Sequence, residues 1–442
     1  MKKTVNREHQ AWYLYDFGNS AYAAVVLLAI YSAYFKNGVV GGAEGSRLWG
    51  VSVGIAMLVV AIAAPILGAI ADFSALKKKF LFIFSLMTWI FTALLFFVEK
   101  GDIFTGMLFF ILAEIGYRSG QVFYNSLLPE IATPAEIGRV SGKGWAIGSL
   151  GGIIALFILL PPIVIFKGTT LPVRLAFPFT ALFFAIFTIP AYRWIKERAN
   201  ARELPEGENY LTIGFKRFAH TLRSARRFKE FGKFMISFLI YNDGILMTLN
   251  FAAIIGAVLY GMTQTQMIIF MIIVQVTSVI GAYLFAIIGE KVGYKKSLVY
   301  AILGMAGAII WMIFNQTLVG FFVIGALAGF ALTGVQSLSR TMIGIFSPKG
   351  QSAEFFGIFS AVGRTSSFIG PTVYGFLALW AARFFENERN MNALLAEQAG
   401  QRVAIISILL FLFTGLFLLL TVDEKKAIQE SEDYLLEEGN GG

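Results

Sequence analysis

The stretch GRVSGKGWAIGSLG at residues 138–151 recurs as GIFSAVGRTSSFIG at residues 357–370, with matching glycine or serine at four positions. The two stretches lie 219 residues apart, and Pro129 recurs at the same distance as Pro348. The two halves of the chain therefore look like copies of one another. Two similar halves predict a binding site at the interface between them.

The composition places this repeat in a membrane. The 442 residues are 57% hydrophobic, with a mean hydropathy of +0.71, far above a soluble domain. A helix needs roughly 20 apolar residues to cross about 30 Å of hydrocarbon. We therefore predict an all-α membrane protein with twelve transmembrane helices in two pseudo-symmetric six-helix bundles. The predicted spans are 13–35, 48–71, 80–98, 103–128, 139–161, 174–194, 231–260, 265–288, 297–314, 318–340, 354–380 and 402–421.

The distribution of basic residues predicts the orientation. If the chain begins in the cytoplasm, 26 of its 36 Lys and Arg residues fall on the cytoplasmic side. The positive-inside rule then places both termini in the cytoplasm. A net charge of +9 could suggest a nucleic-acid ligand, but the basic residues fall in alternate loops, so topology accounts for them. We expect no nucleic-acid partner.

The predicted spans divide the chain into four parts. Residues 1–194 and 231–421 form the two bundles, residues 195–230 form a cytoplasmic linker, and residues 422–442 form an acidic cytoplasmic tail that we expect to be disordered. The linker is expected to contain an amphipathic helix on the inner leaflet, where anionic lipid attracts its basic side. A solvated basic linker is the alternative. The apolar residues at helical spacing are Leu211, Phe215, Phe218 and Leu222.

Polar residues in the predicted span 103–128 follow one helical face. An ionisable group in hydrocarbon costs at least a few kcal/mol, so such a face should line a water-filled cavity or meet the other half. The internal repeat maps this stripe onto Thr333, Ser337 and Arg340 in span 318–340, and the two faces are predicted to line one pathway. Gln336 in the same span is a further candidate for substrate binding or coupling. Alternatively, Glu114 and Arg118 neutralise one another and only fix the packing. The residues of the stripe are Glu114, Arg118, Gln121 and Asn125.

Two aspartates occupy matching places in the two halves. Asp16 begins the first span, close to Asn19, and Asp243 begins the seventh. They are candidates for paired gates or proton acceptors, although either could instead cap a helix or bond a neighbouring helix. Since no histidine falls within a predicted span, any proton coupling is assigned to Asp16, Glu114 or Asp243. Arg364, in the eleventh span, is expected to meet an anionic substrate group or a carboxylate across the interface.

A short cytoplasmic turn joins the second and third spans. Gly68 and Asp72 are followed by Lys77 and Lys78, and the turn has a counterpart in the second half that includes Glu290 and Lys295. An acid at such a turn can accept hydrogen bonds from a helix N-terminus, while the lysines hold the loop at the membrane interface. We predict a gating turn that latches one conformational state and does not bind substrate.

These features resemble the major facilitator superfamily over nearly the whole chain. The stretch Trp12–Tyr22 is similar to the opening signature of its vacuole-effluxer-like family, and the stretches 123–130 and 138–145 match a second signature. That family includes the autophagy-related amino-acid effluxer of fungal vacuoles and many bacterial members. The chain departs from the usual family pattern at two positions. Gly18 stands where the family usually has alanine, and Phe73 stands where the superfamily turn usually has arginine. The latter removes one expected ion pair from the latch.

The resemblance implies export of amino acids or similar small solutes. We predict a secondary active transporter that works by alternating access, with protons as a candidate coupling ion and membrane lipid as its surroundings. The alternatives are a translocator of a lipid or muropeptide-like amphiphile, and a membrane sensor or scaffold that transports nothing. The chain has no cysteine and shows no histidine cluster or phosphate loop, so we expect no enzyme activity, metal or cofactor. A monomer in a bacterial cytoplasmic (inner) membrane is expected.

Overall fold

The computed structural model describes most of residues 2–439. The positions outside the description within that range are 74, 133–136, 167–168, 199–206, 226–227, 347–354, 356–358, 360–361 and 364–367.

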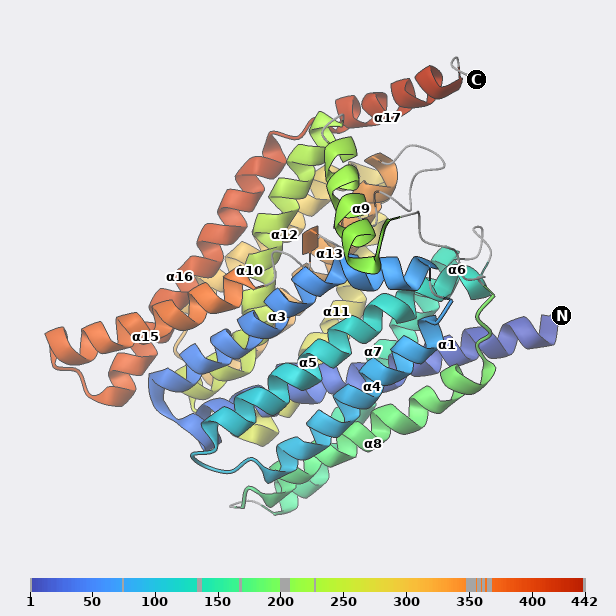
Figure 1. The fold of residues 1–442 in the computed structure, drawn as a ribbon. Helices are drawn as coiled ribbons and strands as arrows, with labels where there is room; N and C mark the ends of the chain where they lie inside the picture. Colours follow the sequence, from blue (N-terminus) through green and yellow to red (C-terminus); the bar gives the residue numbers. More distant parts are fainter. Residues whose placement is uncertain are drawn as a thin grey trace.

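The described residues fold into helices without any strand (Figure 1). The shorter elements are η1 (Ala23–Ala29), α2 (Tyr31–Tyr34), η2 (Phe35–Val40), η3 (Leu95–Phe97), α6 (Leu128–Ile131), α9 (Tyr210–Ala225) and α17 (Glu424–Gly439). The long helices are α1 (Lys2–Tyr22), α3 (Gly42–Phe73), α4 (Lys77–Leu94), α5 (Ile103–Ser126), α7 (Ile137–Ile165), α8 (Leu171–Trp194), α10 (Lys229–Tyr260), α11 (Gln264–Val292), α12 (Tyr294–Phe314), α13 (Leu318–Phe346), α15 (Ile369–Arg389) and α16 (Ala393–Leu420).

Ten segments of the described chain are long and apolar enough to cross a membrane, so the protein is an integral multi-pass membrane protein. Each corresponds to a predicted span. The predicted span 103–128 coincides with α5, whose 24 residues are long enough but less apolar because they include Glu114 and Arg118. The predicted span 354–380 lies partly outside the described residues. The ten segments are Arg7–Val40, Gly42–Ala63, Lys77–Phe97, Ala146–Ile165, Leu171–Trp194, Lys229–Tyr260, Gln264–Val292, Tyr294–Phe314, Leu318–Phe346 and Ala393–Leu420.

The first span departs from a regular α-helix. After α1 the chain widens into the π-helical η1, returns to one α-helical turn in α2 and widens again in η2. Such segments insert an extra residue per turn and occur often at functional sites. The helical segment that holds the first span begins before the predicted span, at Arg7, and includes His9. Its ring Nε2 lies 2.8 Å from the carbonyl oxygen of Ile131.

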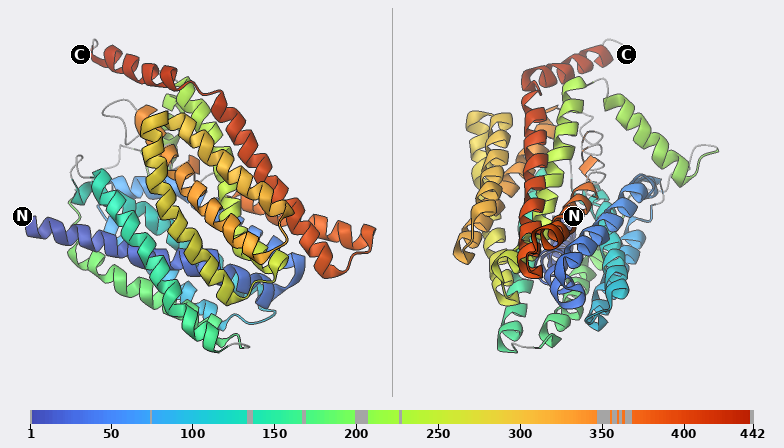
Figure 2. Two further views of the ribbon diagram at one scale, coloured as in Figure 1. Left: turned by 180° about the vertical axis from the view of Figure 1, so that it is seen from behind. Right: turned by 90° about the vertical axis from the view of Figure 1, so that its left-hand side faces the viewer.

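The long helices pack in two groups that follow the chain. In the first group α1 packs on α7 and α8, α3 packs on α5, and α4 packs on α5 and α8. In the second, α10 and α15 pack on α16, and α13 packs on α11 and α12. The principal contacts between the groups join α3 to α15 and α7 to α11. The start of α1 and the helix α17 lie on the same side of the molecule, remote from the α15–α16 hairpin (Figures 1 and 2).

Two helices outside the spans pack against this frame. The linker helix α9 contacts α3 and α10, and its Ile213 packs against Ala69 and Phe73 of α3. The tail is not wholly disordered, contrary to our expectation, because residues 424–439 form α17. This helix contacts α10 and α13, and its Glu430 carboxylate accepts a hydrogen bond from the Glu230 backbone N–H at 3.2 Å.

Candidate functional site

A cavity of about 260 Å³ lies where α1, α5 and α7 face α13. Ligand pockets usually enclose roughly 300–1,000 Å³, so this cavity suits a small solute. Asn125 and Arg340 are exposed at its rim, so the cavity is open. Its lining residues are Trp12, Asp16, Asn19, Ser20, Tyr117, Gln121, Tyr124, Asn125, Ser149 and Arg340.

The cavity brings together half of the residues proposed for substrate binding or coupling. Asp16 and Asn19 lie on one face of α1, three residues apart, and Gln121 and Asn125 lie on one face of α5, four residues apart. Arg340 is their charged neighbour from α13. The cavity is therefore built from both groups of helices and contains groups of both charge signs.

The Asp16 carboxylate packs directly against Gly148 of α7. A Cβ atom at Gly148 would lie 2.6 Å from Asp16 Oδ2, so only glycine leaves room for that oxygen at the helix surface. Nearby, Asn19 is only 3% exposed, and its Oδ1 accepts no hydrogen bond from any part of the chain that the structure describes. A buried acceptor without a donor is costly, so this oxygen is available to a ligand or to water.

An aromatic wall closes one side of the cavity. The rings of Trp12 and Tyr124 stack with centroids 4.4 Å apart, and Tyr15 stacks on Tyr124 at 4.7 Å. Trp12 Nε1 donates to the Tyr124 carbonyl at 3.2 Å, and the Tyr124 hydroxyl donates to the Trp12 carbonyl at 3.1 Å. These reciprocal bonds fix α1 against α5. We did not predict these aromatic residues as site residues from the sequence, although Trp12 and Tyr124 lie inside the two signature stretches.

Glu114 and Arg118 lie farther along the same stripe of α5 and form an ion pair. Arg118 Nε donates to Glu114 Oε1 at 2.7 Å, and the guanidinium lies over the Tyr117 ring at 5.1 Å. The Glu114 side chain is fully buried, and neither residue lines the cavity. In this conformation the pair neutralises its own charge, as in the alternative interpretation.

The counterparts in the second half lie apart from the cavity. Asp243 is buried in α10, where its Oδ1 accepts a hydrogen bond from the Gly370 backbone N–H at 3.3 Å. Gln336 Nε2 donates to Asn242 Oδ1 at 3.2 Å and so ties α13 to α10. Arg364 lies outside the described residues.

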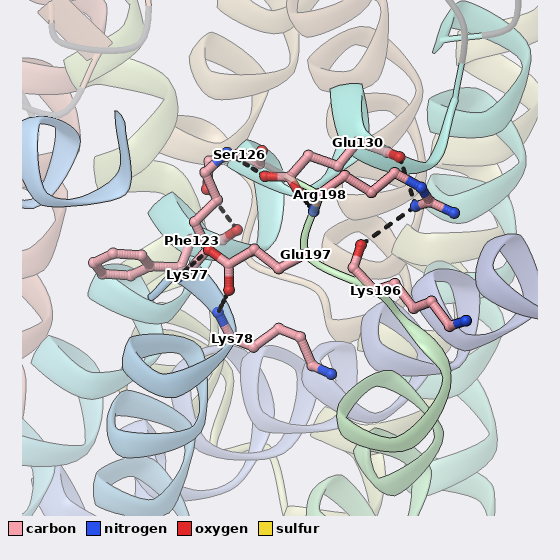
Figure 3. Close-up of polar contacts among 8 residues, drawn as sticks. All are labelled: Lys77, Lys78, Phe123, Ser126, Glu130, Lys196, Glu197 and Arg198. Carbon is pink, nitrogen blue, oxygen red and sulfur yellow. Dashed lines mark hydrogen bonds and ion pairs between the residues drawn. The ribbon is translucent and has the colours of Figure 1, made fainter. Parts of the chain in front are cut away.

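The predicted gating turn is tied down by acids that were not predicted from the sequence (Figure 3). The Lys77 ammonium pairs with Glu130, and Glu197 accepts hydrogen bonds from the backbone N–H groups of Lys77 at 2.7 Å and Lys78 at 3.4 Å. Arg198 also donates to Glu130, from its backbone N–H at 2.5 Å and from Nη1 to the carbonyl at 2.8 Å. An acid does accept from the N-terminus of α4, but it is Glu197, in the segment after α8.

Two other residues of the predicted gating turn, Asp72 and Gly68, form no described contact that holds the turn. Asp72 lies near the end of α3, and its side chain lies outside the description. A Cβ atom at Gly68 would meet no atom within 4 Å, so close packing does not require glycine there. Neither position adds a described contact to the turn.

The second half carries a similar arrangement at the corresponding turn, between α11 and α12. Lys295 Nζ donates to the Val422 carbonyl at 2.5 Å, and Glu230 accepts from the Asp423 backbone N–H at 2.7 Å. Glu290 is exposed. In the first half, Glu8 of α1 likewise accepts hydrogen bonds from the Lys196 backbone N–H at 3.1 Å and from Arg198 Nη2 at 2.8 Å. In each half, therefore, the segment that follows the last helix is held by the start of the first and third long helical segments.

At the opposite end, polar contacts join the two groups of helices. Lys36 of η2 forms an ion pair with Glu397 of α16, and the two residues are only 4% and 8% exposed. Gln401 Nε2 donates to Ser46 Oγ at 2.7 Å. We call these contacts, together with the hydrogen bond of 2.8 Å from Trp49 Nε1 to the Asn250 carbonyl, the outer seal.

Comparisons with known proteins agree with this architecture. A family model described as "Vacuole effluxer Atg22 like" matches residues 49–432. The uncharacterized MFS-type transporter YxiO of Bacillus subtilis is 25% identical over 98% of this chain and 98% of its own length. Autophagy-related protein 22 of Yarrowia lipolytica is 24% identical over 72% of this chain and 56% of its own length. This chain thus spans about half the length of the fungal relatives that it matches.

Solved transporter structures share the fold. A bacterial homolog of the human lysosomal transporter Spinster, inward-facing and unoccupied, superposes with a TM-score of 0.69 at 14% identity, covering 97% of this chain and 98% of its own. A mutant of the nucleoside transporter NupG gives the same TM-score and identity over 95% of this chain and 99% of its own. At this identity the likeness shows the fold alone.

Proposed function

Because this chain belongs to the vacuole effluxer Atg22-like family of MFS-type transporters, we propose that it is a secondary active transporter that exports amino acids. The proposal includes twelve membrane spans, with bundles at residues 1–194 and 231–421, and both termini in the cytoplasm. The membrane is the inner membrane of a bacterium. The two bundles rock about the cavity and expose it to each side in turn.

One observation carries this proposal: a small polar cavity lies between the two groups of helices and contains Asp16 and Arg340 from opposite groups. A zwitterion carries both charges and can pair with both residues. The polar lining also favours a polar solute over the amphiphile alternative.

The distribution of contacts supports an inward-open state. With the N-terminus inside, the outer seal lies at the extracellular end of the helices. The cavity lies nearer the cytoplasmic end, since Asp16 follows the start of α1 and Arg340 precedes the end of α13. Transport would then require the outer seal to open while the cytoplasmic end closes. The gating turn and the acids that bind it would keep the first bundle rigid during this motion.

Proton coupling is proposed for Asp16 and Asp243. Asp16 lies in the open cavity, where water and solute can reach its carboxylate. Asp243 is buried, and its Oδ2 has no partner in the described part of the chain, so this oxygen is free to carry a proton. Glu114 is already paired with Arg118 and is the weaker candidate.

The experiment is to reconstitute the full chain in liposomes that hold a pH-sensitive dye and to add a pool of amino acids. The expected result is a substrate-dependent pH change that Asp16→Asn abolishes. Glu388→Gln, which alters an exposed carboxylate in the α15–α16 hairpin, is the matched control and should behave as the wild type. Isotope exchange of the same pool separates uncoupled transport from none. If neither pH change nor exchange occurs, amino-acid transport is refuted.

A further inference from the structure

We propose, on the basis of the proposed transport function, that the two halves of the chain bind opposite ends of the solute. Asp16 and Asn19 of α1 receive its ammonium group, and Arg340 of α13 receives its carboxylate. A solute with both charges ties the halves together across the cavity and draws the cytoplasmic end closed. A solute with only one charge occupies the site without closing it.

The acceptor end is built on α1. The Asp16 carboxylate lies against Gly148, and Asn19 Oδ1, although buried, accepts no hydrogen bond from the described residues. The Ser20 hydroxyl also lines this side of the cavity. An ammonium group brings three donors and a positive charge, which match a carboxylate, an amide oxygen and a hydroxyl.

The donor end belongs to the other half. Arg340 is exposed in the cavity, and no hydrogen bond or ion pair joins it to another residue in the part of the chain that the structure describes. A guanidinium presents a planar set of donors that binds a carboxylate through two parallel bonds. The Asp16 carboxylate lines the same cavity but forms no ion pair with Arg340, so the Arg340 side chain is available for the carboxylate of a solute.

The placement of the two ends on different groups of helices couples recognition to motion. Helix α1 packs on α7 and α8, whereas α13 packs on α11 and α12, so a rocking motion changes the distance between Asp16 and Arg340. A ligand shifts a conformational equilibrium only by its difference in affinity for the two states. A zwitterion gains its second contact only when the halves approach, and a ligand with one charge gains nothing by closure.

The experiment measures closure of the cytoplasmic end directly. Spin labels are attached to Lys143→Cys on α7 and Lys296→Cys on α12, both exposed, in the full chain in lipid nanodiscs. The native sequence has no cysteine, so labels attach only at these sites. Three probes are compared by pulsed electron–electron distance measurement: neutral L-amino acids, their amides, which keep the ammonium alone, and their N-acetyl derivatives, which keep the carboxylate alone.

We expect the amino acids to shorten the distance between the labels and the other two probes to leave it unchanged. The amides and N-acetyl derivatives should still compete for the site, with apparent affinities about 10-fold to 100-fold weaker, because each lacks one charged hydrogen-bond partner. Arg340→Gln should remove the closure response, and Arg340→Lys should keep part of it, since the charge remains but the planar fork is lost. Arg389→Gln, at the outer end of α15, should respond as the wild type.

Two results would overturn the inference. One is equal closure by amides or N-acetyl derivatives, and the other is undiminished closure by amino acids in Arg340→Gln. Isotope exchange in the same preparation separates the two proposals. Exchange of amino acids with either of these results leaves the transport proposal intact and refutes two-ended recognition, whereas absence of both exchange and closure refutes both.

Discussion

The two ends of the interface between the halves use the same kinds of charged group in opposite ways. At the outer seal, Lys36 and Glu397 come from different halves and are paired and buried. At the cavity, Asp16 and Arg340 also come from different halves, but they line an open space and form no ion pair with each other. The halves are thus held at the outer end by the protein's own contacts. At the cavity end, we propose that a solute makes the corresponding contacts.

Breaking the buried ion pair between Lys36 and Glu397 should open the outer seal more than any other change considered. In Glu397→Gln the Lys36 charge stays buried without a partner, which costs about 3–5 kcal/mol in the closed seal but nothing once water reaches it. The outward-open state should therefore become dominant. Spin labels at Lys100→Cys and Gln316→Cys, both exposed in loops at that end, should report a longer distance.

The double variant Lys36→Gln with Glu397→Gln serves as the control for that prediction, because it removes both charges together. In this double variant the outer seal should close again, at least in part. An unchanged label distance in Glu397→Gln would mean that the pair does not hold the seal.

A clash at the close approach of α3 and α15 should open the seal by a smaller amount. A Cβ atom at Gly50 would collide with the Pro371 carbonyl oxygen and lie 3.3 Å from Gly375 Cα. Gly50→Ala should therefore weaken the seal by about 1–3 kcal/mol, the usual range for overpacking. The same pair of labels measures the shift, and Gly304→Ala, whose Cβ would meet its nearest atom only at 3.8 Å, should cause none.

Crowding the cavity should impair transport and leave the seal intact. Gly148→Ala would place a methyl group 2.6 Å from Asp16 Oδ2 and push the carboxylate out of position. We expect amino-acid exchange to fall about tenfold, which corresponds to about 1.4 kcal/mol, close to the lower end of the range for one hydrogen bond to a charged group. Gly307→Ala, where the added atom meets nothing within 4 Å, is the matched control. Normal exchange in Gly148→Ala would argue against a role for the Asp16 position.

Removal of one neutral hydrogen bond from the seal should have the smallest effect. Trp49→Phe deletes the donor to the Asn250 carbonyl and leaves most of the ring packing, so the closed seal should lose about 1 kcal/mol. A small broadening of the outer distance distribution is the expected readout. Trp380→Phe, at an exposed position on α15, should leave the distribution unchanged. An effect as large as that of Glu397→Gln would show that the ion pair has no special role.

The parts of this site that sequence patterns predicted are those with helical periodicity. Gln121 and Asn125 were found because they repeat on one helix face, and Arg340 because the internal repeat maps it onto that face. The fold class follows for the same reason, since membrane-length apolar runs are a local signal. Helix α5 shows the limit of this signal, because the polar stripe that marks the site also makes the helix less apolar.

The rest depends on contacts between residues far apart in the chain. Glu397 pairs with Lys36 from another half, and Glu130 and Glu197 lie beyond helix ends where no periodicity marks them. Trp12 and Tyr124 are aromatic residues in apolar helices, and such residues usually only pack. Only the folded chain distinguishes them as the wall of a cavity.

The π-helical segment η1 lies between Asp16 and Lys36 in the same membrane span. Because an α-helix turns by about 100° per residue, deletion of one residue within Ala23–Ala29 would restore a regular helix and rotate Lys36 by about that angle relative to Asp16. The number of residues in this segment therefore sets the rotation of Lys36 relative to Asp16. With the present length, Asp16 faces the cavity while Lys36 faces Glu397. A chain that lacks one residue at this point and is otherwise identical would keep both charges but could place only one of them against its partner at a time.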